Sequence, residues 1–259
     1  MQRPGETPAA VLSAMRIVPV TQIDIISVPG PWPLSEGQRA AVGDYWRGAT
    51  EANPHLWDGR ILGLSAPSGG MPSVENGVLR AEAREDAYSA FMLWRQQGFP
   101  EIGICHAFGW ALIVSSDNAL IYGVMGGQTA NAGRVYPPGG SLEPRDVLPD
   151  GRVDVPRCIA LELEEETGLR LDEAAVGGMV VVFDGPRLSF GRVLRFGEPA
   201  ERLATRIRAN LDRQEHRELA DVVVVRSQAD AERAGAVPYA MAVAEAFFAG
   251  TLLPEPDLV

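Results

Sequence analysis

The chain has 259 residues, of which 46% are hydrophobic, and its formal net charge is −11 with a pI near 4.8. This length suits one large domain or a catalytic domain with an appendage. The negative charge disfavours binding to nucleic acids and to anionic membranes. No segment approaches the roughly 18 apolar residues of a membrane span, and residues 1–15 lack the apolar core of a signal peptide and read as a loose arm. The two cysteines, Cys105 and Cys158, are too few for a disulfide framework, so we expect reduced, buried thiols in a cytoplasmic protein.

The first hundred residues predict an N-terminal α/β extension, residues 1–100. Residues 15–28, "MRIVPVTQIDIISV", alternate and are rich in β-branched residues, which predicts one strand. Residues 33–53 open with Ser35 as a plausible N-cap and predict a helix. Residues 59–85 predict two strands joined by a turn rich in Gly, Pro and Ser, and residues 86–99 predict a second helix.

The remaining residues, 101–259, form the second expected domain. Residues 109–125 predict a hairpin, and residues 126–156 form a long loop dense in Gly and Pro, a kind of loop that is usually functional or disordered. A glutamate-rich helix follows, and the later segments are two strands within 176–196, a helix at 199–213, a strand at 219–227 and a helix at 237–250. Because strands and helices interleave while hairpins also occur, the pattern favours an α/β sandwich with a mixed sheet.

The helix around "ALELEEETGL" concentrates carboxylates on one side. Asp154 is a suitable N-cap and Gly168 a natural residue after the helix end. At about 100° per residue, Glu162, Glu165 and Glu166 fall within an arc of roughly 100°. Two interpretations follow: a solvated acidic face, or a site for a divalent cation such as Mg²⁺, whose charge makes converging carboxylates favourable.

The surrounding motifs resemble the Nudix box, a loop–helix–loop of a family that hydrolyses nucleoside diphosphates linked to another moiety. The resemblance lies in "PPGGSLEP" upstream and "ELEEETGL" downstream, and it covers about 31 residues, 139–169. It implies a Nudix-type α/β/α sandwich with a mixed β-sheet, here with an N-terminal extension. It also implies a hydrolase that uses Mg²⁺ or Mn²⁺.

Two departures from the family pattern stand out. Gly140 and the position of the family's helix arginine are 21 residues apart where the pattern requires 14, so the loop holds seven extra residues. The glutamate that the family has within this loop has no clear match, and Asp150 and Asp154 are the only candidates to replace it. The arginine position is Leu161. Glu165 therefore lacks its usual helix partner, and we expect a partner from elsewhere in the chain or a more direct role at the metal.

The resemblance also implies roles for individual residues. The implied metal ligands are Glu162 and Glu166, with Glu165 as a third. The candidates for the catalytic base are Glu165, Glu215 and Glu218, the last two of which are equally well read as exposed charges at a helix end. The candidates for substrate binding are Gly139, Gly140, Glu143 and Arg134, with Arg187 and Arg192 as further candidates for phosphate contacts. The default interpretation of the histidines is a structural or surface role, and this applies to His55, His106 and His216. The default for the tryptophans is packing in the core, with stacking on a nucleotide base as the alternative, and this applies to Trp46, Trp57 and Trp110.

A second, more particular resemblance concerns the substrate. The stretch "NPHLWDGR", residues 53–60, is similar to a segment of the Nudix branch that cleaves UDP-glucose and related UDP-sugars, although a plain turn explains it equally well. The first hypothesis is therefore hydrolysis of a UDP-sugar to UMP and a sugar 1-phosphate. The alternatives are another nucleoside diphosphate substrate such as ADP-ribose, or a Nudix domain that has lost catalysis and senses nucleotide-sugars. The sequence leaves open whether the protein is a homodimer.

Overall fold

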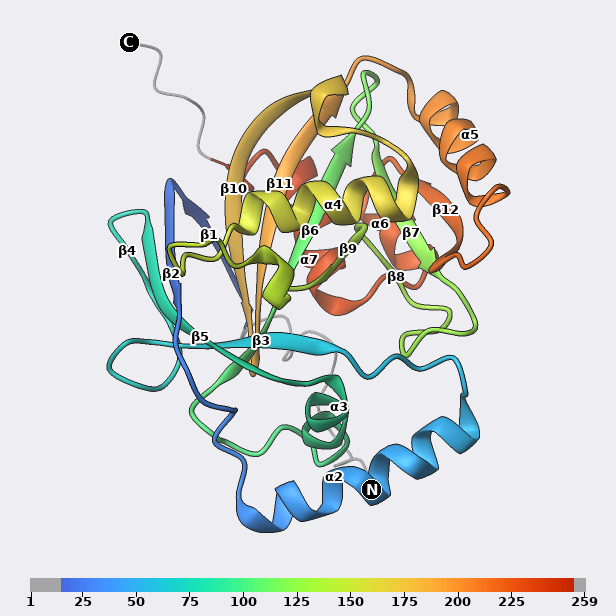
Figure 1. Cartoon of the computed structure of the whole chain (residues 1–259). Coiled ribbons are helices and arrows are strands. Elements are labelled where there is room, and N and C mark those ends of the chain that lie inside the picture. Colours follow the sequence, from blue (N-terminus) through green and yellow to red (C-terminus); the bar gives the residue numbers. More distant parts are fainter. Residues whose placement is uncertain (1–14, 254–259) are drawn as a thin grey trace.

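One mixed sheet runs through the molecule (Figure 1). The computed structural model describes residues 15–253, so all but the last residue of the expected N-terminal arm lies outside the described part. Within residues 15–253 twelve strands belong to this sheet. The strands are β1 (Arg16–Val20), β2 (Gln22–Ser27), β3 (Arg60–Ser65), β4 (Val74–Glu75), β5 (Val78–Ala87), β6 (Cys105–Val114), β7 (Leu120–Met125), β8 (Val135–Tyr136), β9 (Gly139–Ser141), β10 (Ala174–Asp184), β11 (Arg187–Phe196) and β12 (Leu219–Val225).

Strand β6 is the centre of the sheet. The main order is β1-β10-β11-β6-β3-β5-β2, with parallel pairs β11–β6 and β2–β5. The other edge of β6 pairs in turn with β3, β9 and β7, all antiparallel, and β7 continues to β12 and β8. The sheet is therefore mixed, as the sequence predicted, and β6 brings the N-terminal strands, the Gly-Gly segment and the C-terminal strands together.

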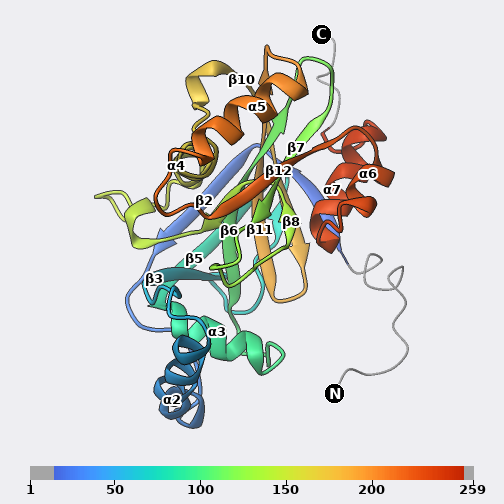
Figure 2. The same cartoon turned by 90° about the vertical axis from the view of Figure 1, so that its right-hand side faces the viewer.

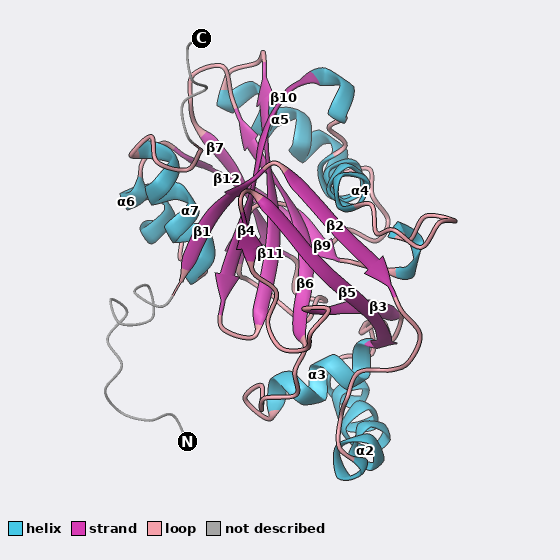
Figure 3. Ribbon diagram, turned by 90° about the vertical axis from the view of Figure 1, so that its left-hand side faces the viewer, coloured by secondary structure: helices cyan, strands magenta, loops and turns pink. Residues whose placement is uncertain are grey.

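Helices cover both faces of the sheet. They are α2 (Glu36–Ala52), α3 (Tyr88–Gln96), α4 (Val155–Thr167), α5 (Ala200–Leu211), α6 (Gln228–Arg233) and α7 (Pro238–Phe248), with short 3₁₀ turns η1 (Pro144–Asp146) and η2 (Leu171–Glu173). Helices α4 and α5 lie on one face and α6 and α7 on the other (Figures 2 and 3). This confirms the expected α/β/α sandwich.

The two faces of β6 show why the layers form. Ala107, Ala111 and Ile113 belong to the core under α4 and α5, whereas Trp110 and Leu112 belong to the core under α7. Successive side chains of a strand point to opposite faces, so one nearly continuous apolar strand supplies both cores.

A third, smaller core joins α3 and the segment before α2 to the sheet. Trp32 is 1% exposed and meets Trp94 edge-on, with ring centroids 5.7 Å apart. Asp86, at the end of β5, accepts hydrogen bonds from the backbone N–H of Trp32 at 2.9 Å and from the Arg39 guanidinium of α2. The carboxylate of Asp86 thus ties α2 to the sheet edge.

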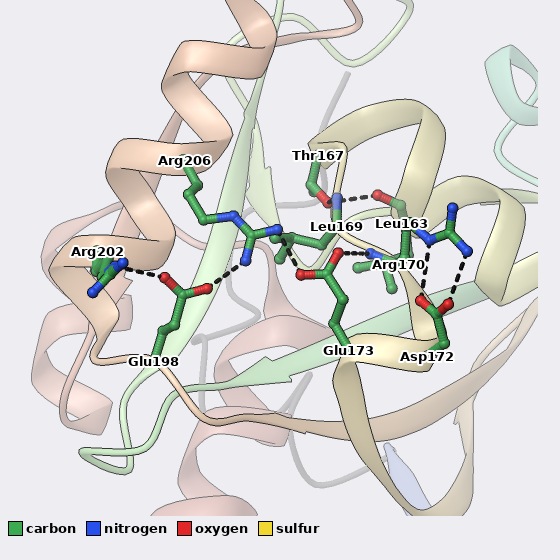
Figure 4. A network of polar contacts seen from close by, with 9 residues as sticks. All are labelled: Leu163, Thr167, Leu169, Arg170, Asp172, Glu173, Glu198, Arg202 and Arg206. Carbon is green, nitrogen blue, oxygen red and sulfur yellow. Dashed lines mark hydrogen bonds and ion pairs between the residues drawn. The ribbon is translucent and has the colours of Figure 1, made fainter.

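Helix α4 is held at both ends. Asp154 caps its first turn by accepting from the Arg157 N–H at 3.0 Å, and Gly168 ends it with a φ of +70°. Just beyond, Arg206 of α5 donates to Glu173 of η2 at 2.6 Å (Figure 4). Both caps agree with the sequence analysis, and Figure 4 shows how α5 is fastened to the segment after α4.

The structure differs from the predicted elements in several places. The single strand expected over 15–28 is two strands, β1 and β2, which pair with β10 and β5 near the two ends of the sheet. The loop expected over 126–156 contains β8, β9 and η1, and α6 was not expected. The sheet continues across the predicted boundary at residue 100 through the β3–β6 pair, and the division into 1–100 and 101–259 stays a prediction. Cys105 and Cys158 are free and buried, as expected, and no helix among residues 15–253 is both long and apolar enough to cross a membrane.

Candidate functional site

An acidic cleft of about 420 Å³ opens where α4 meets β9. We use the term acidic cleft for the space lined by Glu143, Glu162, Glu165 and Glu218. These carboxylates come from the loop after β9, from α4 and from the residue before β12. The cleft thus gathers four of the acidic residues that the sequence analysis selected, from three separate segments.

Glu162 lies against the Gly-Gly segment. Its side chain is 9% exposed, and a Cβ added to Gly140 would lie 2.5 Å from its carboxyl carbon, so glycine is required for this approach. Gly139 is required for a different reason, because its added Cβ would lie 2.2 Å from the Gly109 carbonyl oxygen in β6. Burial raises the pKa of Glu162 to about 8, although Arg145 opposes this effect.

Glu166 lies one turn further along α4, behind the cleft wall. It is 3% exposed, and its Oε2 accepts a hydrogen bond from the Gly139 N–H at 2.7 Å. Its Oε1 is buried and has no hydrogen-bond partner among the described residues. Burial, followed by the charge of Glu162, raises the pKa of Glu166 well above its usual value. A buried carboxylate with an unmet oxygen next to a second carboxylate is an arrangement that a cation would stabilise.

Glu165 finds its partner outside its helix. The guanidinium of Arg145, in η1, donates to Glu165 Oε1 at 2.8 Å and to Glu162 Oε1 at 2.7 Å, and it lies 3.1 Å from Glu143. The Arg145 carbonyl in turn accepts from the Arg157 guanidinium. The expectation of a partner from elsewhere is confirmed, and Arg145 comes from the loop that carries the extra residues. Leu161, at the family's arginine position, is half-buried.

Of the three candidates for the base, Glu165 and Glu218 line the acidic cleft and Glu215 does not. Glu218 lines the acidic cleft, although the residue is exposed. Desolvation by the surrounding protein raises the pKa of Glu218, and the charge of Glu165 adds to the rise. Glu215 is exposed and lines neither this cleft nor the pocket described below.

The segment "NPHLWDGR" forms part of the cleft wall. His55 and Trp57 line the acidic cleft, and the Trp57 side chain is 56% exposed. Asn53 fixes the turn by accepting from the His55 N–H at 3.1 Å and donating to the Gln128 carbonyl at 2.9 Å, while Asp58 accepts from the Ser89 N–H at 2.8 Å. The segment is a turn, and it is a turn that faces the cleft. Trp110, by contrast, is buried and donates to Ser189.

A second cavity, of about 150 Å³, shares the Gly139–Ser141 wall with the acidic cleft. We call it the basic pocket, because the guanidinium side chains of Arg95, Arg134 and Arg187 line it. Its other walls are mainly aromatic and include Tyr88, Phe91, Phe108, Tyr136 and Tyr239. Burial lowers the pKa of Arg95, and the nearby charges of Arg134 and Arg187 lower it further.

His106 also lines the basic pocket. Its Nε2 lies 2.9 Å from the Ser141 Oγ, its ring stacks on Phe91 at 4.1 Å, and its Nδ1 is buried without a partner among the described residues. Burial lowers the pKa of His106 to about 3, so the ring is neutral. Of the arginines that the sequence selected, Arg134 and Arg187 reach this pocket, and Arg192 lines neither cavity.

Sequence reasoning missed Arg145 and Arg95. Arg145 was detectable in principle as the first cation after "GGSLEP", in a loop whose extra length already needed a purpose. Arg95 left no signal, because it lies in an ordinary apolar helix, α3, that only the folded chain brings to the pocket.

The donor side chains of the acidic cleft decide which metal ion could bind there. Among residues 15–253 no three His, Cys, Asp or Glu side chains already converge as a cation site. The chemistry of the donors nevertheless fits a hard divalent cation, since Glu162 and the unpartnered oxygen of Glu166 are adjacent carboxylates one helical turn apart. Arg145 supplies the positive charge at Glu162 and Glu165 in this structure.

Comparisons with known proteins give limited similarity. No family model matches the sequence, and no curated protein matches it. An Ap4A hydrolase from C. elegans is 13% identical, with a TM-score of 0.39 over 55% of this chain and 98% of that chain. A MutT protein from Methanosarcina mazei Go1 is 19% identical, with a TM-score of 0.38 over 56% and 94% of the two chains. RenU, a Nudix hydrolase from M. Smegmatis, is 14% identical, with a TM-score of 0.39 over 59% and 89%.

Proposed function

We propose that this protein is a Nudix-type hydrolase that cleaves the diphosphate linkage of a nucleoside diphosphate-linked substrate with the help of Mg²⁺ or Mn²⁺. One observation carries the proposal. The buried carboxylates of Glu162 and Glu166 meet the Gly139–Gly140 backbone, and the Glu166 Oε1 has no partner among the described residues. This is the juxtaposition that the "GGSLEP" and "ELEEETGL" motifs lead one to expect.

Glu162 and Glu166 would hold the cation, with Glu165 as the third carboxylate. A bound divalent ion supplies charge neutralisation at the phosphate oxygens and lowers the pKa of a coordinated water. The chain's own part is to aim the carboxylates: the Gly139 N–H fixes the Glu166 carboxylate, and Arg145 orients Glu165.

Glu218 is the base that the geometry favours. It lies in the same cleft as Glu162 and Glu165, and its raised pKa brings a carboxylate closer to neutral pH, where a general base is most effective. Glu215 lines neither cavity, which removes the reason for choosing it.

The preferred substrate in this proposal is UDP-glucose or a related UDP-sugar, which would give UMP and a sugar 1-phosphate. Support comes from residues 53–60, whose resemblance to the UDP-sugar branch now coincides with a place on the cleft wall. The exposed Trp57 ring offers a face for the base. A site that hydrogen-bonds uracil leaves polar groups unpaired with another base, at a cost of roughly 1–3 kcal/mol.

The test is turnover of a nucleotide panel with Mg²⁺, read by phosphate release through a coupled phosphatase. We expect kcat/KM for UDP-glucose or UDP-galactose to exceed that for ADP-ribose and nucleoside triphosphates by at least about tenfold, which corresponds to about 1.4 kcal/mol. Equal or better values for ADP-ribose would reject the UDP-sugar assignment and leave the hydrolase proposal standing. Absence of turnover across the panel would reject the hydrolase proposal.

A nucleotide-sugar sensor without catalysis is the second candidate. The observation that favours it is the Arg145 guanidinium, which already forms ion pairs with Glu162 and Glu165. Tight UDP-sugar binding with no hydrolysis at saturating Mg²⁺ would select this candidate.

A further inference from the structure

The basic pocket holds positive charge that the proposed reaction does not use. Three guanidinium groups, those of Arg95, Arg134 and Arg187, line one cavity of about 150 Å³. Of these, only Arg187 has a carboxylate partner among residues 15–253, namely Asp184 on the facing strand β10. Arg95 makes its polar side-chain contact with the neutral Asn131 at 3.2 Å.

An excess of positive charge in one cavity is unusual for such an acidic chain. The whole sequence has a formal charge of −11, and the neighbouring acidic cleft is dominated by carboxylates. Burial lowers the pKa of Arg95, and the charges of Arg134 and Arg187 lower it further. Like charges gathered at partly buried positions are costly unless an opposite charge joins them.

Unmet hydrogen-bonding capacity is concentrated at the same place. The Nδ1 of His106 and the Nε of Arg187 are both buried and lack partners among the described residues, and both residues line the pocket. His106 as a whole is only 8% exposed. Buried polar groups in folded proteins are nearly always paired, so these atoms indicate a polar ligand.

The side chains of the pocket favour an oxyanion as the ligand, and the position of the pocket bears on which part of the substrate would carry it. Guanidinium groups match the oxygens of phosphate and carboxylate in charge and geometry. In the proposed function the scissile diphosphate lies in the acidic cleft, where a divalent cation neutralises it. The basic pocket lies beyond the shared Gly139–Ser141 wall and would receive a different group of the same molecule.

We infer that the basic pocket binds a phosphate or carboxylate group that the substrate carries in addition to the diphosphate linkage that is cut. The inference rests on the proposed function only for the placement of the diphosphate. The favoured substrates are therefore acidic ones, such as a UDP-sugar whose sugar bears a carboxylate, or a nucleotide with a further phosphate.

Two matched pairs of probes distinguish these sources. UDP-glucuronic acid differs from UDP-glucose by a carboxylate, and ADP-ribose 2′-phosphate differs from ADP-ribose by a phosphate. Calorimetry on the full chain in EDTA measures binding without metal or turnover. We expect the member of at least one pair that carries the additional anionic group to bind at least tenfold more tightly than the member without it, and the pair that shows the difference identifies the anionic group.

Substitutions of the pocket arginines test whether the basic pocket causes this difference in binding. Arg95→Gln should reduce the ratio within the responding pair to below about threefold, and Arg134→Gln, at an exposed side chain, is the second variant if the first does not fold. Arg47→Gln is the matched control, because Arg47 lies on α2, pairs with Asp44 and lines neither cavity. Equal binding within both pairs, or an unchanged ratio in both pocket variants, would overturn the inference. A protein that hydrolyses nothing but still prefers the acidic ligand would refute the proposed function and support the pocket.

Discussion

Replacing Glu166 by glutamine should act in opposite directions on stability and on function. The change removes one buried negative charge and barely alters the volume of the side chain. The carbonyl oxygen of the new amide can still accept from the Gly139 N–H, so the contact that fixes β9 against α4 is kept. What disappears is the repulsion with Glu162, Glu218 and Glu165 that contributes to the raised pKa of this carboxyl.

The size of the effect follows from linkage. A carboxyl whose pKa is raised in the folded state destabilises the fold at every pH above its ordinary value, because the unfolded chain ionises freely there, whereas the folded chain must keep the proton or hold the charge at a cost. Each unit of pKa shift corresponds to 1.36 kcal/mol. Because the pKa of Glu166 is raised well above 4.5, we expect Glu166→Gln to increase the free energy of unfolding at pH 7 in EDTA by at least about 1 kcal/mol.

With Mg²⁺ the order of stability of the wild type and Glu166→Gln should reverse. A ligand that binds only the folded state stabilises it in proportion to the logarithm of its concentration over its dissociation constant. The wild type should therefore gain stability from Mg²⁺ while Glu166→Gln gains little, and the variant should lose turnover of UDP-glucose. Urea unfolding with and without Mg²⁺ measures both changes in stability, and the coupled phosphatase assay measures turnover. Glu164→Gln is the matched control, since Glu164 is exposed on the same helix and does not line the cleft. Wild-type Mg²⁺ stabilisation and turnover in Glu166→Gln would refute the reasoning.

Three further changes test other parts of the structure. Arg145→Gln removes the cation that Glu162 already holds, so calorimetry should show Mg²⁺ binding at least about threefold tighter without substrate, and unchanged affinity would show that this arginine does not compete. His106 is neutral in the fold, with a pKa of about 3 against an ordinary 6.5, so the unfolded chain takes up a proton that the folded chain does not as pH falls below 6.5. The wild type should lose about 2 kcal/mol between pH 6.5 and 5 relative to His106→Gln, and parallel urea midpoints over that range would contradict this. Asp86→Asn leaves the Arg39 guanidinium without its buried partner and should lower the free energy of unfolding by about 3 kcal/mol, whereas a loss below about 1 kcal/mol would show that other contacts hold α2 in place.

The elements that sequence reasoning located correctly are those whose signals are local. The N-cap Asp154 and the terminal Gly168 fixed the extent of α4, and helical periodicity grouped its glutamates. The prediction of one strand over residues 15–28 was wrong for the same reason. Alternation identifies the strand conformation but does not indicate which neighbouring strand each part pairs with. The chain passes from β1 to β2 at Thr21, and the two halves go to β10 and β5 without any break in the pattern.

The short strands and the ion pairs could not be predicted from the sequence, for a different reason. β8 and β9 are two and three residues long, too short for any periodicity, and they exist because β7 and β6 offer free edges. The ion pairs of Arg145 with α4 span 17 and 20 residues, so composition gives no hint of them. The basic pocket is still more distributed, since its arginines follow from packing α3, the segment before β8 and β11 around one wall.

The two cavities have opposite charge and share the Gly139–Ser141 wall, and this arrangement constrains how an anionic substrate is bound. Without a cation, the carboxylates of the acidic cleft repel phosphate oxygens, so the diphosphate gains little by entering. The guanidinium groups beyond the wall attract an anionic group whether or not a cation is present. Binding through the basic pocket should therefore be independent of metal, whereas placement of the diphosphate against Glu162 and Glu166 should require it. In the proposed function this division would separate recognition of the substrate from its activation, and it would account for three arginines in one small cavity of a strongly negative chain.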